Sequence, residues 1–113
     1  MADLKRIILE MGTGNDLHGQ DYTKAAKRAV QDALHHSSLA FFRSLKLDPN
    51  LMEIDLTLAA QHPEQIDLEA VAATLPYGTV TPRAVKGGLN VPDEEHGDVA
   101  VIVNAGVLVR YPL

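Results

Sequence analysis

The chain has 113 residues, a formal net charge of −5 and no cysteine. Its length falls at the commonest domain size, so we expect a single domain spanning residues 1–113. Without cysteine there is no disulfide framework, no thiolate nucleophile and no Cys-based metal site. No stripe of Lys and Arg offsets the negative charge, which argues against nucleic-acid binding. No run approaches the ~20 apolar residues of a membrane span, and with no signal-peptide pattern the sequence favours a cytoplasmic location.

The first part of the chain predicts a strand, a glycine-rich loop and a helix. Arg6–Glu10 is a short run with β-branched residues that ends at Gly12, which is typical of a strand followed by a turn. Asp21 or Thr23 can then cap a helix, since a short side-chain oxygen accepts an orphan backbone N–H. Within that helix small apolar residues recur at helical spacing, with charged residues on the other side: Ala25, Ala26, Ala29, Val30, Ala33 and Leu34. His35 and His36 close the helix, where positive charge suits the C-terminal dipole.

The middle of the chain predicts a second strand and a second helix. Residues 52–60 alternate strictly between apolar and polar side chains up to Ala60, the pattern of a strand with one buried face. A helix follows His62, with Asp67 as its N-cap or Pro63 as an earlier start. Its apolar residues recur at helical spacing until Pro76 and Gly78 stop the run.

Two further strands complete the pattern. Residues 79–85 read as an edge strand, because Pro82 cannot donate a ladder hydrogen bond. A bend at residues 86–88 and an acidic turn at residues 92–97 lead to an apolar strand over residues 99–109. The order β-α-β-α-β-β predicts an α+β two-layer sandwich, with a four-stranded mixed sheet and two helices on one face. The last strand is apolar on both sides, yet no element remains to cover the second, so we expect a homo-oligomer.

The densest chemistry lies in residues 12–21. This segment carries three glycines, two carboxylates, an imidazole and amide groups between a strand and a helix N-terminus. Backbone N–H groups gathered there suit an anionic or carbonyl ligand. Asp16 and His18 are the candidate catalytic pair, in which the aspartate would hold the imidazole in one tautomer. With Glu10 or Asp21 they are also possible metal ligands, although the sequence identifies no metal or other cofactor.

The remaining candidate ligand-binding residues flank that pair or lie near it by prediction: Gly12, Thr13, Gly14, Asn15, Asp21, Lys24, Lys86 and Asn104. Asn104 stands beside Gly106 in an apolar strand, which indicates either an amide that satisfies a β-bulge or one that contacts a ligand. The competing interpretation of the loop is a turn whose Asn and Asp side chains satisfy local backbone groups.

The segment from Met11 to Ala26, with Arg28-Ala29-Val30, resembles the signature of a small family of conserved uncharacterised prokaryotic proteins. That resemblance extends over nearly the whole chain, including Leu75-Pro76-Tyr77-Gly78 and Val103-Asn104-Ala105. Gly14-Asn15 and Asp21-Tyr22-Thr23-Lys24 are also similar to one repeat of the ring-opening amidohydrolases, the family of cyanuric acid hydrolase and barbiturase. This second resemblance implies βαβαββ units around a threefold axis with sheets inward, and so favours a homotrimer or a multiple of three.

The amidohydrolase chemistry does not carry over. The residues matching that family's Lys and Ser positions are Thr13 and Lys86, so both members of the catalytic dyad are missing. From the loop residues we expect a small-molecule-binding or hydrolytic protein for a small polar compound, with a polar site around Gly12–Asp21 at a subunit interface. The alternative is a non-catalytic oligomeric or ligand-sensing module.

Overall fold

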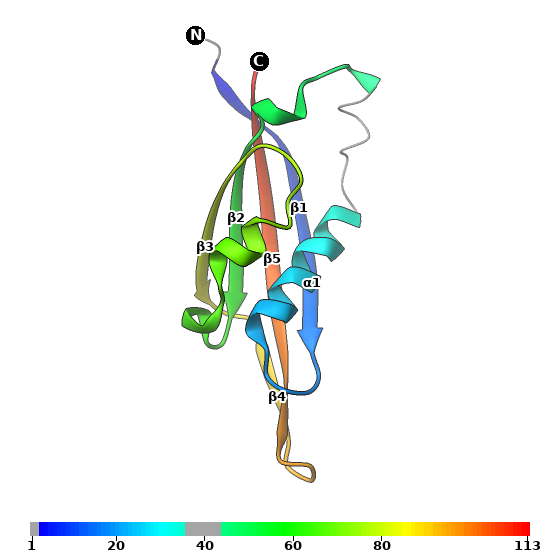
Figure 1. Ribbon diagram of the computed structural model, residues 1–113, viewed down its shortest axis with the longest axis vertical. Coiled ribbons are helices and arrows are strands. Elements are labelled where there is room, and N and C mark those ends of the chain that lie inside the picture. Colours follow the sequence, from blue (N-terminus) through cyan, green and yellow to red (C-terminus); the bar gives the residue numbers. More distant parts are fainter. Residues whose placement is uncertain (1–2, 36–43) are drawn as a thin grey trace.

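The computed structural model describes residues 3–35 and 44–113, so the expectation for His36 lies outside the described residues. The fold is α+β, as the sequence predicts: one open sheet with its helices on one face (Figure 1). The strands are β1 (Leu4–Asp16), β2 (Glu53–Ala60), β3 (Thr79–Lys86), β4 (Leu89–Asp93) and β5 (Asp98–Pro112). Among the described residues, the helices with defined bounds are α1 (Tyr22–His35) and α3 (Leu68–Ala72), with short 3-10 turns η1 (Pro49–Leu51) and η2 (Pro63–Gln65). No helix in the described ranges is long and apolar enough to cross a membrane.

The sheet is mixed and has five strands, one more than predicted. Its order is β1-β5-β2-β3, in which β2 and β3 are parallel and the other pairs antiparallel. β3 lies at an edge, as Pro82 predicts. The additional strand, β4, pairs with the first half of β5, which extends past the end of β2. Proline at position 92 favours a loop, but β4 is an edge strand on which proline is tolerated.

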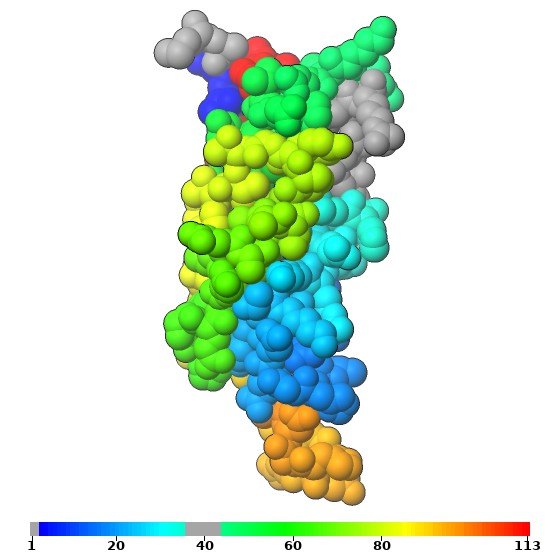
Figure 2. All heavy atoms as spheres, viewed as in Figure 1, coloured from blue at the N-terminus to red at the C-terminus, as the bar shows by residue number. Residues whose placement is uncertain are grey.

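The β4–β5 hairpin gives the molecule an elongated shape. Its tip projects beyond the helix layer at the end of the molecule opposite to the two termini, as Figures 1 and 2 show. The extents along the principal axes are 56, 23 and 18 Å. The acidic segment predicted as an exposed turn forms this tip, although Pro92 and Asp93 themselves belong to β4.

β1 is much longer than predicted. The expected glycine loop from Gly12 onward is strand as far as Asp16, and only Leu17–Asp21 separates β1 from α1. Asp21 caps α1, because its Oδ1 accepts the Lys24 N–H at 3.0 Å. Asp67 likewise caps α3, accepting the N–H of Ala70 at 3.1 Å.

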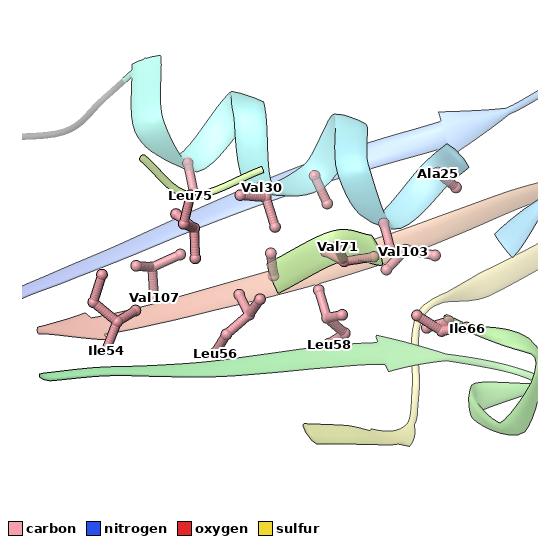
Figure 3. Close-up of a cluster of buried hydrophobic side chains, with 14 of the residues drawn as sticks. Ala25, Val30, Ile54, Leu56, Leu58, Ile66, Val71, Leu75, Val103 and Val107 are labelled. Atoms are coloured by element: carbon pink, nitrogen blue, oxygen red, sulfur yellow. The ribbon is translucent and has the colours of Figure 1, made fainter. Parts of the chain in front are cut away.

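The hydrophobic core lies between the helices and the sheet. Alternate residues of β2 and β5 are buried against α1 and α3, as the period-two pattern requires (Figure 3). The core is aliphatic apart from two tyrosines, and Figure 3 labels its centre: Ala25, Val30, Ile54, Leu56, Leu58, Ile66, Val71, Leu75, Val103 and Val107.

The opposite side of the sheet carries no helix from residues 3–35 or 44–113, and we call it the open face. Strand register places the following residues on it: Leu9, Met11, Thr13, Asn15, Glu53, Asp55, Thr57, Ala59, Thr81, Arg83, Val85, Leu89, Val91, Ala100, Ile102, Asn104, Gly106, Leu108 and Arg110. Met11 is 70% exposed and Leu9 45% exposed. No element in the described part of the chain covers this face, so the second apolar side of β5 is uncovered as the sequence predicts.

Candidate functional site

Asp16, the last residue of β1, is a buried carboxylate at the start of the β1–α1 turn. Its Oδ2 accepts the backbone N–H of Asp21 at 2.9 Å. Its Oδ1 lies 3.7 Å from the ammonium of Lys24 and 3.8 Å from the guanidinium of Arg28. Burial of a charge is tolerated only with such partners. Asp16 therefore closes the turn and orients the first two turns of α1.

His18 contacts a different aspartate from the one expected. Its Nδ1 lies 3.0 Å from Oδ2 of Asp98, at the start of β5. Asp98 also accepts its neighbour's N–H, from Val99, at 2.8 Å. The hydrogen bond from His18, then that from Val99, holds the pKa of Asp98 below its ordinary value. The imidazole is 86% exposed. The pair thus fastens the turn to the base of the hairpin.

Gly12 and Gly14 are strand residues that bring β1 close to α1. A Cβ at Gly12 would lie 2.3 Å from the Ala29 carbonyl oxygen. One at Gly14 would lie 2.2 Å from both the Ala25 carbonyl oxygen and the Ala29 amide nitrogen. The two glycines of β1 and the alanines on the facing side of α1 therefore pack together and allow the helix to lie close to the strand. The helix backbone fills the space that a phosphate-cradling loop leaves open for its ligand.

Thr13 and Asn104, two of the predicted ligand-binding residues, meet on the open face. They are paired across β1 and β5, and the Thr13 hydroxyl lies 3.4 Å from Oδ1 of Asn104. Asn104 is exposed, and register is continuous around it, so the expected bulge at Gly106 is wrong. The register shift in β1 lies instead between Arg6 and Ile8.

A hollow of about 440 Å³ lies around this pair. Gly106 and Ala59 form its floor, because their side chains are absent or small and an added Cβ at Gly106 would meet nothing within 4 Å. Polar groups reach it from three strands and from α1, and the residues that line it are Met11, Gly12, Thr13, Asp32, Thr57, Ala59, Asn104, Ala105 and Gly106. In the described ranges no hydrogen bond uses the amide N–H groups of Asn104.

Charged side chains stand on two sides of the hollow. On the β1 side, Oδ2 of Asp32 accepts the Thr13 N–H at 2.9 Å. On the β3 side, Nη1 of Arg83 donates to the hydroxyl oxygen of Thr57 at 3.2 Å. Asp55 is shared by Arg83, at 3.8 Å, and by the closer Arg110. The carboxylate of Asp55 is thus close to the guanidinium groups of both Arg83 and Arg110.

The other predicted residues are spread over two regions. Asn15 uses its backbone carbonyl to accept a hydrogen bond from Arg28 at 2.7 Å, and Lys24 contacts Asp16. Lys86 is exposed at the end of β3. The structure therefore brings Thr13, Gly12 and Asn104 together at the hollow but leaves the rest at the β1–α1 turn or beyond it. Among residues 3–35 and 44–113, no three His, Asp or Glu side chains form a group that could hold a metal ion.

The sequence did not predict that Thr57, Gly106 and Arg83 lie in or beside the site. Thr57 was predicted on the polar face of its strand, and that alternation was the available signal. Nothing in the sequence indicates that β5 lies between β1 and β2, which is what joins Thr13, Asn104 and Thr57.

Comparisons with known proteins identify relatives of the whole chain. A crystal structure of an FtsZ-like protein of unknown function from Nostoc punctiforme PCC 73102 is 37% identical, with a TM-score of 0.83. The match covers 100% of both chains. No curated protein matches. A family model described as "Conserved hypothetical protein (Lin0512_fam)" matches residues 6–109. The chain therefore belongs to the Lin0512 family of conserved hypothetical proteins.

Proposed function

We propose that the protein binds a small polar molecule in the hollow of the open face, and that further copies of the chain close this site. One observation carries the proposal: hydroxyl and amide groups converge on a hollow of about 440 Å³ in the middle of an uncovered sheet face. Ligand sites are typically concave, 300–1,000 Å³ in volume, and combine apolar walls with a few placed polar groups. The hollow has these properties.

Self-association is supported by the residues around the hollow. Large apolar side chains lie on the same open face, and several are about half exposed or more: Leu9, Met11, Val85, Leu89 and Val91. Contiguous exposed apolar surface is typical of an interaction site. The threefold arrangement implied by the amidohydrolase resemblance, with sheets turned inward, would place this face against neighbouring copies. A neighbouring copy would also close the open side of the hollow.

Binding is favoured over hydrolysis by the positions of the two candidate catalytic residues. Asp16 is occupied by the Asp21 N–H and two cations, and His18 is a solvent-exposed partner of Asp98. Neither lines the hollow. A non-catalytic ligand-sensing module, the alternative expected from the sequence, fits this arrangement better than an enzyme does.

The likeness to the Nostoc protein supports a shared architecture. "FtsZ-like" describes that relative, and for this chain we propose the fold alone. The Gly12-Thr13-Gly14 run lacks the Gly-Lys-Ser/Thr ending of a phosphate-binding loop. Because a helix backbone lies directly against both glycines, we do not extend the likeness to nucleotide binding.

The self-association part is tested by placing a charge on the open face. Met11 is 70% exposed in the single chain, so Met11→Glu should leave the fold intact. At an interface it buries a carboxylate and removes a buried methionine worth about 1.5–3 kcal/mol. We expect association to weaken by tenfold or more, at about 1.4 kcal/mol per factor of ten.

The matched control is Gln31→Glu, which adds the same charge on the exposed side of α1. Sedimentation velocity on the two variants and the wild-type protein measures the assembly. The proposal predicts that only Met11→Glu dissociates. A wild-type monomer, or equal behaviour of both variants, would contradict the interface.

A further inference from the structure

We infer that the ligand of the hollow is a small organic monoanion whose carboxylate is recognised by Arg83. This inference rests on the proposed function and adds the chemical class of the ligand. It starts from the strand register, which places Met11, Gly106, Thr57 and Arg83 in one row across the sheet. Gly106 supplies no side chain, so the row is open between Met11 and Thr57.

Arg83 does not itself line the hollow, but it is hydrogen-bonded to Thr57, which does, and it has further N–H donors available. A guanidinium has five N–H donors in a fixed fork. Arg83 places Nη1 on Thr57, which lines the hollow, and Nη2 3.8 Å from Asp55. That second separation exceeds hydrogen-bond length. Arg83 is half exposed, so a carboxylate entering from the hollow can form a bidentate pair with it.

The charge balance favours an anion on the β3 side of the hollow. The nearer partner of Asp55 is Arg110, so the Asp55 charge is already compensated when Arg83 turns toward a ligand. Two guanidinium groups, those of Arg83 and Arg110, stand beside the single carboxylate of Asp55, so this group of three side chains carries one net positive charge. Polar neutral groups of the same ligand can meet the Asn104 amide and the Thr13 hydroxyl.

The opposite rim carries a carboxylate, which makes a second negative charge on the ligand less favourable there. Asp32 lines the hollow on the β1 side, with its carboxylate on the Thr13 N–H. A second anionic group there would face a like charge. The hollow therefore has a cationic rim and an anionic rim, and its ligand has one carboxylate directed at Arg83.

Benzoate and benzamide test this inference, because they have nearly the same shape and differ in charge. Amide NMR titrations of the full-length protein would compare their affinities in the wild-type, Arg83→Gln and Gly106→Val proteins. We expect benzoate to bind wild type about tenfold more tightly than benzamide, the usual size of a charge-assisted hydrogen bond. Arg83→Gln should remove that preference and keep benzamide binding, whereas Gly106→Val should fill the hollow and remove both.

The outcomes separate the two claims. Equal binding of the two probes, unchanged by Arg83→Gln, overturns the anion inference and leaves the hollow as the site. Binding that survives Gly106→Val overturns the hollow itself. No shift near Gly106 with either probe at millimolar concentration overturns both. Thermal denaturation of each variant shows whether a loss of binding reflects unfolding, and Arg83→Lys, which keeps the charge but loses the fork, should recover part of the preference.

Discussion

Alanine at Gly14 and alanine at Gly106 should have opposite effects, although both glycines lie inside strands. At Gly14 the new Cβ would lie 2.2 Å from two backbone atoms of α1, about 1.2 Å short of ordinary van der Waals contact. Backbone cannot rotate away, so the helix must lift from β1. Overpacking typically costs about 1–3 kcal/mol. Alanine also lowers the conformational entropy of the unfolded chain, which stabilises the folded protein by about 0.4–1 kcal/mol.

At Gly106 the same methyl group meets nothing within 4 Å. The stabilisation from the lower entropy of the unfolded chain then remains, and alanine also has a better strand propensity than glycine. Thermal denaturation followed by circular dichroism would measure both variants. For a domain of this size about 1 kcal/mol moves the melting temperature by roughly 4 °C. We expect Gly14→Ala to melt lower by up to roughly 10 °C and Gly106→Ala to melt at or above the wild-type temperature. Indistinguishable melting of the two variants would refute the close helix–strand packing.

Two further predictions concern the β1–α1 turn. Asp16→Ala should lower the free energy of unfolding in urea by about 1–3 kcal/mol, because it leaves the Asp21 N–H without its acceptor. Asp16→Asn keeps an acceptor and should lose less. Equal losses in the two variants would argue against the hydrogen bond. His18→Ala should raise the pKa of Asp98 toward its ordinary value in an NMR titration. Because the folded-state pKa is the lower one, the stabilisation from this pair is complete above the ordinary carboxyl pKa and is lost as the pH falls through the lowered value. A His18→Ala protein with unchanged Asp98 titration would contradict the pairing.

Local patterns were enough to predict most of the fold. The alternation of residues 52–60 identified β2 and its buried face. The apolar spacing from Ala25 onward identified α1. Asp21 and Asp67 cap the helices, each being one of the two helix starts that the sequence left open. These features depend on residues close in sequence, and their periodicities leave few alternatives.

The errors arose where distant segments decide the local structure. Gly12 and Gly14 predict a loop when read alone, but they pair with Ala105 and Val103 of β5 as strand residues, and their missing side chains let α1 pack directly on them. Residues 89–93 contain little strand signal. They form a strand because β5 extends beyond the end of β2, so that the first residues of β5 are free to pair with β4.

The candidate site was predicted in part. Thr13 and Asn104 were identified from the sequence and do lie together. Their meeting place could not be predicted, because it depends on the insertion of β5 between β1 and β2. Asp16 and His18 were grouped because they are close in sequence, but each has its own partner, the turn backbone for one and Asp98 for the other.

The most direct measurement of the central claim is native mass spectrometry of the purified protein beside its Gly106→Val variant, each repeated under denaturing conditions. We predict that the wild-type protein is an oligomer, with additional small-molecule mass that disappears on denaturation and is missing from the variant. A bare 12.2 kDa monomer, or additional mass that the variant retains, would contradict a ligand site in the hollow of the open face.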